Sequence, residues 1–382
     1  MYKSLDVVII GAGPIGISIA ARLVFSKRSF IVLEKGESVG ANILEWGHVS
    51  LFSNWQESVD SKCHKLLNEQ ASISYALEDF PTGNEFVHQY LQPIANHPLL
   101  KNNIQLNSKV HTVSFDNVTN NFTITYHQNK ECRMVKSKVV IDASGTWGNY
   151  NKLVENYADL FGYACFNIPN SKQITDYFQN ATIAIIGNGH SAMNSIAVVS
   201  QYSNAVIYWI LRNDEPNFGN SKVDGKSIKL ETEVIHYLKQ NRIRLIKNFS
   251  LKHIFQVKNQ LNLVSEGSKS LTGIDFLIQN IGANADYSFL QNIPLNLEPT
   301  LNIPKNLAKK IDPKLHTCNT LKYTFQDTLI SEIDYYVVGM KSFGKASNFL
   351  LSSGYKISDE LVDRLNRVAF TKVNIKYIED EF

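Results

Sequence analysis

Three glycines near the start of the chain, Gly11, Gly13 and Gly16, have the G-x-G-x-x-G spacing of a turn that cradles a pyrophosphate. The first glycine permits a tight bend, the second lets the backbone approach the phosphates, and the third lets a helix pack closely on a strand. We count Pro14, inside the turn, among the cofactor-binding residues. The motif predicts a bound dinucleotide, against the alternative of a glycine-rich turn in an ordinary βαβ unit.

The segments around this turn have the order that such a site needs. Residues 7–10 are apolar and predict a short buried strand, and residues 15–24 predict a helix. The free N–H groups and partial positive charge of that helix N-terminus suit phosphates. A second strand, 30–33, ends in Glu34, 18 residues after Gly16, near the expected offset of an acid that accepts ribose hydroxyls. Lys35 follows directly and is counted with the site.

The pattern recurs 176 residues later. A strand over 181–186 leads into a G-x-G-x-x-A turn and then a helix over 192–199. Two such fingerprints, each between a strand and a helix, are far more specific than one. The predicted contacts of this second site are Gly187, Gly189, His190, Ser191 and Ala192.

The strand after each turn ends in a different charge. The second of these strands, 205–211, is followed by Arg212, which suits a 2′-phosphate as Glu34 suits a free 2′-hydroxyl. A charge-assisted hydrogen bond of about 1.5–3 kcal/mol would select NADP over NAD by roughly 10- to 150-fold. The alternative is a solvated arginine at a strand end. No second basic residue stands close by in the sequence.

Composition limits the classes of function. With 382 residues, 44% hydrophobic and 19% charged, the chain is an ordinary globular protein of two or three domains. A net charge of +3 indicates neither nucleic acid nor an acidic membrane surface, and no apolar run is long enough to predict a membrane-spanning helix. The four cysteines form no C-x-x-C pair, so we expect no metal and no dithiol centre, and reduced thiols in a cytoplasmic protein.

The rest of the chain predicts how these sites are held. Residues 36–60 form an aromatic-rich stretch that either lines a flat ring or is a surface loop fixed by buried rings. Residues 109–115, 122–126 and 132–138 predict an antiparallel meander, and 139–143 a buried strand. Another buried strand, 274–279, leads to the turn that holds Gly282, which we count among the residues on the NADP side. Residues 291–330 show little periodicity, and a strand over 334–338 precedes a closing helix over 348–368.

We therefore predict an α/β protein with two Rossmann-like, three-layer dinucleotide-binding domains, the first with a small antiparallel β insertion. The expected FAD-binding domain is discontinuous, 1–165 and 320–382. The expected NADP-binding domain, with its connection, covers 166–319.

These motifs resemble two-dinucleotide-binding-domain flavoproteins, in particular flavin-containing monooxygenases and other FAD/NAD(P)-binding proteins similar to the pyridine nucleotide-disulfide oxidoreductases. A narrower resemblance is to bacterial oxidoreductases with the segments G-H-V-x-L-F-S-x-W, here 47–55, and G-M-K-S-[YF]-G, here 339–344. The resemblance implies FAD in the first domain and NADPH in the second. It places Gly339 and Met340 near the FAD. We count with them Ala143 and Gly145, from a strand end similar to the A-T-G of these enzymes, and Trp46 and Trp55 of the aromatic-rich stretch. The resemblance also makes Asn54 similar to an asparagine that monooxygenases place beside the isoalloxazine.

The departures from this pattern concern the reaction. Phe161-Gly162 stands where the F-x-G-x-x-x-H-x-x-x-W sequence of flavin monooxygenases would begin, but no His or Trp follows at that spacing. The C-x-x-C of thioredoxin reductases is absent, and Gly339-Met340 replaces the G-D pair of many relatives. The first departure favours electron transfer without oxygen insertion, and the second argues against dithiol exchange.

Three functions stay open at this point. The first is a monooxygenase-like enzyme that uses FAD, NADPH and molecular oxygen to oxidise a small molecule. The second is a reductase that passes electrons to a protein, quinone or small acceptor, and the third a sensory flavoprotein.

The sequence names few candidates for catalysis. Asn54 and Lys341 are the candidate catalytic residues, although a lysine at 341 could equally lie on the surface. His190 suits a phosphate or ring-packing role better than acid–base chemistry. A homodimer is compatible with the sequence.

Overall fold

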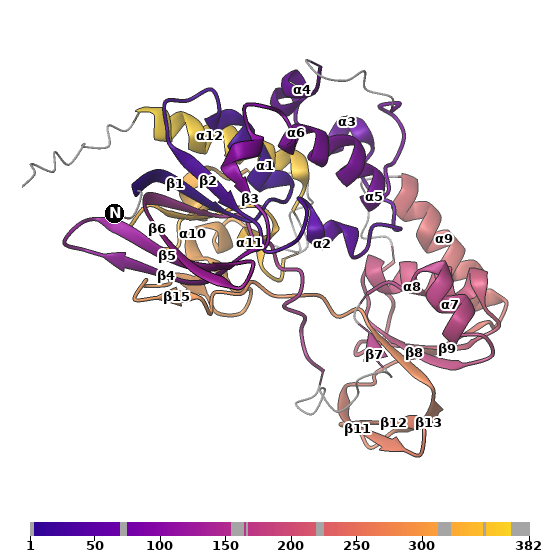
Figure 1. Ribbon diagram of the computed structural model, residues 1–382. Coiled ribbons are helices and arrows are strands. Elements are labelled where there is room, and N and C mark those ends of the chain that lie inside the picture. The colour runs from indigo at the N-terminus through magenta and orange to yellow at the C-terminus, as the bar shows by residue number, and fades with distance from the viewer. Residues whose placement is uncertain are drawn as a thin grey trace, which may run out of the picture.

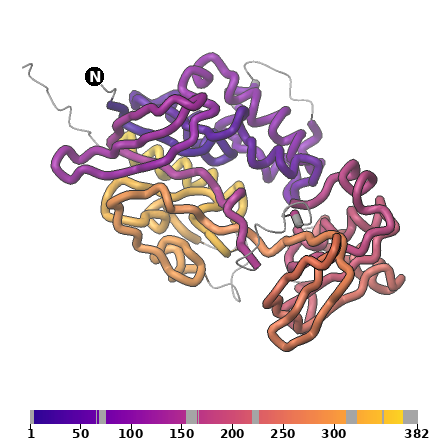
Figure 2. The backbone as a smooth tube through the Cα atoms, turned by 60° about the horizontal axis from the view of Figure 1, so that its bottom comes forward, coloured from indigo at the N-terminus to yellow at the C-terminus, as the bar shows by residue number. Residues whose placement is uncertain are grey.

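The computed structural model describes residues 4–68, 75–153, 164–165, 167–218, 225–311, 322–346 and 349–367. They form two lobes, each built on its own parallel or mixed sheet, and two segments of the chain cross between the lobes (Figures 1 and 2). The predicted α/β class with two Rossmann-like units is confirmed.

The first lobe contains an eight-stranded sheet in the order β15-β4-β5-β6-β1-β2-β3, with β18 beside β6. Ile10 of β1 lies opposite both Leu33 of β2 and Asp142 of β6, so the carboxyl ends of these parallel strands meet at one edge. The strands are β1 (Ser4–Ile10), β2 (Phe30–Leu33), β3 (Ile104–Gln105), β4 (Ser108–Asp116), β5 (Asn121–Gln128), β6 (Glu131–Asp142), β15 (Leu290–Gln291) and β18 (Tyr335–Val337).

The strand β6 joins the meander to the Rossmann unit. The sequence predicts two strands, 132–138 and 139–143, but the structure has one strand of twelve residues. It pairs antiparallel with β5 over residues 131–137 and parallel with β1 over 136–142, and β18 takes the place of β5 at residues 140–142. No Gly, Pro or Asn interrupts β6, so nothing ends the strand where the partner changes.

Helices cover one face of this sheet, with α1 packed against α12 and α4 (Figure 1). Val7 and Ile9 of β1 face these helices, whereas Val8 and Ile10 face the opposite core, as alternation along a strand requires. The helices are α1 (Pro14–Leu23), α2 (Ala41–Leu44), α3 (Trp55–Ser58), α4 (Ser61–Asn68), α5 (Gly83–Phe86), a π turn (Val87–Leu91), α6 (Gln92–Ala95), a 3₁₀ turn (Lys101–Asn103), α11 (Met340–Phe343) and α12 (Leu351–Arg367).

The connection over 291–330 packs on the first lobe. β15 pairs with β4, and Ile303 and Leu307 belong to the same core as α1. Its elements, β16 (Leu297–Glu298), β17 (Ile303–Pro304), α10 (Lys305–Ala308) and a 3₁₀ turn (Phe325–Thr328), are too short to show a period in the sequence. The chain therefore returns to the first lobe before residue 290, earlier than the expected boundary at 320.

The second lobe has a five-stranded parallel sheet in the order β10-β9-β8-β14-β7. Three helices cover one face, and a small antiparallel sheet packs on the other (Figure 1). The elements are β7 (Ala164–Cys165), α7 (Ser171–Tyr177), β8 (Thr182–Ile186), α8 (His190–Tyr202), β9 (Val206–Ile210), α9 (Gly225–Lys239), β10 (Ile243–Ile246), β11 (Leu251–Val257), β12 (Gln260–Ser265), β13 (Ser270–Ile274) and β14 (Phe276–Gln279).

Candidate active site

The opening glycine turn lies at the carboxyl edge of the first sheet and leaves an open cradle. Gly11 has a φ of +100°, and a Cβ there would lie 2.7 Å from the carbonyl oxygen of Ala143. A Cβ on Gly16 would lie 2.0 Å from the carbonyl oxygen of Gly11. At Gly13 a Cβ would meet no heavy atom within 4 Å, and no side chain caps α1, which begins after this residue. The turn is tightly packed at Gly11 and Gly16 but open at Gly13, and the N–H groups at the start of α1 are free. This combination fits a pyrophosphate.

Glu34 fixes the end of β2 against this turn. Glu34 is 6% exposed. Its carboxylate accepts hydrogen bonds from the backbone N–H of Ala12 at 2.7 Å and from that of Gly36 at 2.8 Å. A carboxylate has about four acceptor positions, so capacity for ribose hydroxyls remains. Lys35 is exposed, and its Nζ would lie 3.6 Å from a Cβ on Gly148.

Two further turns reach the same edge. Gly145, after β6, has a φ of +71° and faces open space. Gly339, after β18, has a φ of +68°, and a Cβ there would lie 3.2 Å from Cγ1 of Ile15 in the first turn of α1. Met340 is 37% exposed beside it. The turn at Gly339 therefore meets the opening turn, although more than 300 residues separate the two in the sequence.

A buried ion pair lies behind these turns. The ammonium group of Lys341 is 2.6 Å from Oδ2 of Asp142, and neither side chain has any exposed surface. Lys341 also donates to Oγ of Ser144 at 3.1 Å, and its Nζ lies 4.8 Å from the ring centre of Tyr287 and 4.6 Å from that of Phe289. Since this ammonium group is enclosed and bound, we assign Lys341 to positioning and not to contact with substrate.

Asp142 also hydrogen-bonds groups outside the ion pair. Its Oδ1 accepts from the backbone N–H of Ser144 at 3.1 Å and from the Ser144 hydroxyl at 2.6 Å, and its Oδ2 accepts from the hydroxyl of Tyr335 at 2.7 Å. Burial and the neighbouring Asp142 carboxylate raise the pKa of Tyr335 well above its ordinary value, so the hydroxyl stays a donor. One carboxylate thus fixes β18, α11 and the turn after β6.

The two tryptophans predicted near the cofactor differ in their surroundings. Trp46 is partly buried, with its ring centre 6.3 Å from that of Trp147, which in turn lies 5.4 Å from that of Tyr150. Trp55 is 3% exposed and stacks on Tyr75 at 3.9 Å within the core. Trp55 therefore packs the base of the loop, whereas Trp46 belongs to a row of rings that runs toward the crossing segment.

Asn54 begins the short helix α3. Its Oδ1 accepts a hydrogen bond from the backbone N–H of Glu57 at 3.0 Å, which is the geometry of an N-cap. In the described part of the chain its Nδ2 donates to no other residue. The amide is therefore held at one end and retains a donor, and its place beside a flavin stays a prediction.

The second glycine turn repeats the geometry of the first. Gly187 has a φ of +145°, and a Cβ there would lie 2.3 Å from the carbonyl oxygen of Asn280, whereas a Cβ on Gly189 would meet nothing within 4 Å. No side chain caps α8, which begins with His190. Ser191 is exposed, and Ala192 is buried beside Gly187. This turn, too, fits a pyrophosphate.

Arg212 lies at the rim of this second turn. It is exposed, two residues after the end of β9, and forms no hydrogen bond or ion pair with any residue in the described ranges. Its guanidinium is therefore available to an anion. The structure adds a basic residue that the sequence spacing did not show, because Lys247 follows the neighbouring strand β10 and reaches the same edge.

The two lobes meet at the predicted aromatic loop and at the two crossing segments. The ring of Phe52 lies 4.7 Å from that of His190, and Nζ of Lys226 donates to the carbonyl of Leu51 at 2.9 Å. Tyr150 and Ala283 form an antiparallel bridge between the crossing segments. Gly282 lies in the second segment, next to this bridge, with a φ of +82°.

No described cysteine lies at either glycine turn. Cys63 is buried on α4 and hydrogen-bonds Asp60, and burial raises its thiol pKa far above the ordinary value. Cys132 is exposed near the start of β6, about 30 Å along the strand from Asp142. Cys165 lies on β7, and burial raises its pKa to about 11. Cys318 and Phe161-Gly162 lie outside the described residues.

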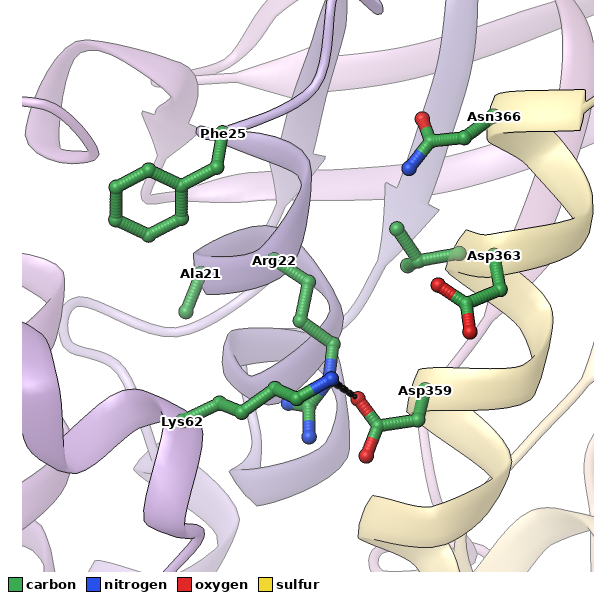
Figure 3. Close-up of a pocket in the computed structure, with 8 residues that line it drawn as sticks. Ala21, Arg22, Phe25, Lys62, Asp359, Asp363 and Asn366 are labelled. Carbon is green, nitrogen blue, oxygen red and sulfur yellow. Dashed lines mark hydrogen bonds and ion pairs between the residues drawn. The ribbon is translucent and has the colours of Figure 1, made fainter.

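A surface pocket of about 230 Å³ lies away from both turns, between α1, α4 and α12 (Figure 3). Arg22 and Lys62 both bind Asp359 in it, and Arg22 also binds the buried Asp60. These four charged side chains are therefore paired within the protein and link α1, α4 and α12.

None of the helices placed by the structure is both long and apolar enough to cross a membrane. Within the described ranges no three His, Cys, Asp or Glu side chains come together as a metal site would require.

The fold and its two cradles define a two-domain oxidoreductase that binds two dinucleotides. Residues 8–307 match the model of the pyridine nucleotide-disulphide oxidoreductase family, and the chain belongs to this family of flavin-dependent oxidoreductases, which use FAD and a pyridine nucleotide. No curated protein sequence matches it.

Solved structures share the fold at low identity. Bacillithiol disulfide reductase Bdr from Bacillus cereus superposes with a TM-score of 0.74 at 16% identity, covering 95% of this chain and 99% of that one. A flavin monooxygenase mutant from Stenotrophomonas maltophilia gives 0.65 at 19% identity, with 95% and 98% covered. Ornithine N-hydroxylase from Kutzneria sp. 744 gives 0.64 at 15% identity, with 96% and 99% covered.

Proposed function

We propose that this chain is an FAD-dependent oxidoreductase that NADPH reduces and that then oxidises a small molecule with molecular oxygen. The observation that carries the proposal is the pair of matched cradles with opposite charges at their rims. Gly13 and Glu34 form the first, and Gly189 and Arg212 form the second. A buried acid suits the ribose of FAD, and a free arginine suits the 2′-phosphate of NADPH.

The residues of the first lobe would hold FAD through its pyrophosphate, ribose and ring system. Glu34 would accept hydrogen bonds from the ribose hydroxyls, the N–H groups after Gly13 would bind the phosphates, and the turns at Gly145 and Gly339 would line the same edge of the cradle. When bound, FAD supplies the two-electron chemistry that accepts hydride and passes electrons to an acceptor. The Asp142–Lys341 pair keeps the turns at Gly145 and Gly339 in fixed positions.

The residues of the second lobe would hold the reductant. The free N–H groups of α8 bind the pyrophosphate, and Arg212 binds the 2′-phosphate. The Phe52–His190 contact joins this turn to the loop that carries Asn54. Asn54 is fixed through its Oδ1, so its Nδ2 would be the donor available to the reacting rings.

The position of the cysteines supports an acceptor that meets the flavin directly. A disulfide reductase of the dithiol type needs a thiol at the flavin, and in the ranges that the structure describes Cys63, Cys132 and Cys165 lie elsewhere. The second candidate is a reductase that passes electrons to a quinone, protein or small acceptor. The absence of His and Trp after Phe161-Gly162 favours this candidate.

The two candidates differ in the fate of oxygen. The protein is purified with its flavin, reduced by NADPH without oxygen, and then mixed with oxygen carrying a heavy isotope in the presence of small amines, thioethers and ketones. Incorporation of the isotope into one compound, with a matching fall in peroxide release, is expected for the monooxygenase-like function. Stoichiometric peroxide with every compound, together with rapid electron transfer to a quinone, would assign the reductase instead.

A further inference from the structure

The rim of the second cradle carries two acids next to Arg212. Asp214 and Glu215 follow it on the loop after β9, and both are exposed. Carboxylates beside a phosphate dianion oppose its binding by like-charge repulsion. Taken alone, this loop is therefore poorly suited to a 2′-phosphate.

The neighbouring strand supplies the groups that hold both acids. β10 runs parallel to β9, with Ile246 opposite Ile210, so the residues after β10 reach the same edge of the sheet. Nζ of Lys247 lies 2.7 Å from Oε1 of Glu215, and Nδ2 of Asn248 donates to Oδ1 of Asp214 at 3.0 Å. Two consecutive residues of one strand end thus bind two consecutive acids of the other.

The glycine turn fixes the same loop through its backbone. Nδ2 of Asn188 donates to the carbonyl of Glu215 at 3.1 Å, and the backbone N–H of Asn217 donates to Oδ1 of Asn188 at 2.7 Å. The loop that carries Arg212 is therefore built against the phosphate turn, and Glu215 is directed toward Lys247.

We propose that the Glu215–Lys247 ion pair tunes the affinity of this site for 2′-phosphorylated nucleotides, which Arg212 binds. Lys247 neutralises Glu215 and so removes one of the two negative charges that oppose an anion bound at Arg212. The proposal rests on the assignment of NADPH to the second lobe. The side chains of Lys247 and Glu215 are 37% and 71% exposed, and exposed pairs contribute little to folding. We therefore expect their effect in the binding of the anion, where the two partners should act in opposite directions.

The test compares two ligands that differ only by the 2′-phosphate, adenosine 2′,5′-bisphosphate and adenosine 5′-monophosphate, by calorimetric titration of the holoenzyme. Lys247→Met leaves the Glu215 charge unopposed and is expected to weaken binding of the bisphosphate roughly three- to tenfold. Glu215→Gln frees Lys247 as a second cation and is expected to strengthen it by a similar factor. The monophosphate affinity stays unchanged in both, and Lys252→Met, at an exposed lysine of the same lobe, changes neither.

Arg212→Ala separates failure of this proposal from failure of the proposed function. One outcome is that Arg212→Ala weakens binding of the bisphosphate alone while Lys247→Met and Glu215→Gln leave its affinity unchanged or shift it in the same direction. In that case the ion-pair proposal is wrong and the NADPH assignment stands. If Arg212→Ala also has no effect, the second lobe does not read the 2′-phosphate and both are overturned. Because all three side chains lie at the surface, circular dichroism is expected to show unchanged folding.

Discussion

Asp142 and Lys341 form an ion pair without exposed surface, with Oδ2 and Nζ 2.6 Å apart, although 199 residues separate them in the chain. The pairing of β18 with the end of β6 brings them together, because Val337 lies opposite Asp142. Each residue adjoins a turn that reaches the opening glycine motif. The ion pair therefore sets the distance between two turns that lie on the proposed flavin site.

Lys341→Met is expected to lower the free energy of unfolding by about 3–5 kcal/mol, because Asp142 would remain charged and buried without its cation. Urea denaturation followed by circular dichroism measures this change. The matched control is Lys345→Met, at an exposed lysine four residues on, which should stay within about 0.5 kcal/mol of the parent protein.

A double variant that removes both charges distinguishes the cost of an unpaired buried charge from the cost of losing the lysine side chain. Asp142→Asn combined with Lys341→Met should be more stable than Lys341→Met alone, since no uncompensated charge remains. Equal stability of Lys341→Met and the parent protein would contradict a charged, buried Asp142.

Gly13→Ala and Gly16→Ala should fail in different ways. Gly13 has a φ of −77° and open space at its Cβ position, so Gly13→Ala is expected to fold normally but to lose at least about tenfold in flavin affinity, as its methyl group occupies the phosphate cradle. Gly16→Ala places a Cβ against the carbonyl of Gly11 and should lower the Tm. Flavin content per protein and thermal melts give both readouts, and normal flavin binding by Gly13→Ala would refute the cradle.

The pocket between α1, α4 and α12 gives a pH-dependent prediction. Burial would raise the pKa of Asp359, but hydrogen bonds from Arg22 and Lys62 outweigh it and hold the pKa below the ordinary value. A carboxyl whose folded pKa is depressed stabilises the protein above its unfolded pKa, and this stabilisation is lost as the pH falls through the folded pKa.

Asp359→Asn should therefore lower the Tm by the same amount at pH 8 and at pH 5.5, both well above the ordinary aspartate pKa of about 3.9. The difference from the parent protein should shrink below pH 4. A difference that grows on acidification would show that Asp359 is not held as a carboxylate.

Phe52→Ala removes the ring contact that joins the phosphate turn of the second lobe to the loop of the first. Aromatic pairs contribute about 0.5–1.5 kcal/mol, so the KM for NADPH should rise roughly two- to tenfold. Phe52→Tyr keeps the ring and serves as the control. Steady-state oxidation of NADPH measures both, and flavin content should not change. A lower KM in Phe52→Ala would mean that the ring obstructs the site.

The glycine turns and the fold class were readable from the sequence because their residues are neighbours in the chain. Gly11 to Gly16 and Gly187 to Ala192 each lie between one strand and one helix, and both cradles have the expected form. Glu34 lies at the end of the second strand for the same reason. Local spacing was therefore enough to predict the two glycine turns.

Residues that meet only through sheet pairing could not be found in this way. Asp142 looked like the end of an ordinary strand, and its partner Lys341 could not be told from a surface lysine. Lys247 approaches the rim of Arg212 only because β10 is the neighbour of β9. Trp55 had no local signal that it faces the core and not a ligand. A buried acid at a strand end is the one signal that could have indicated Asp142.

The most direct test is an anaerobic titration of the purified holoenzyme with NADPH, in which the absorbance of the flavin is monitored. The parent protein should bleach with one equivalent of NADPH, Gly189→Val should keep its flavin but no longer bleach, and Gly13→Val should fold without flavin. This result would assign FAD to the first turn and the reductant to the second. Bound flavin in Gly13→Val, or bleaching of Gly189→Val at the parent rate, would contradict that assignment.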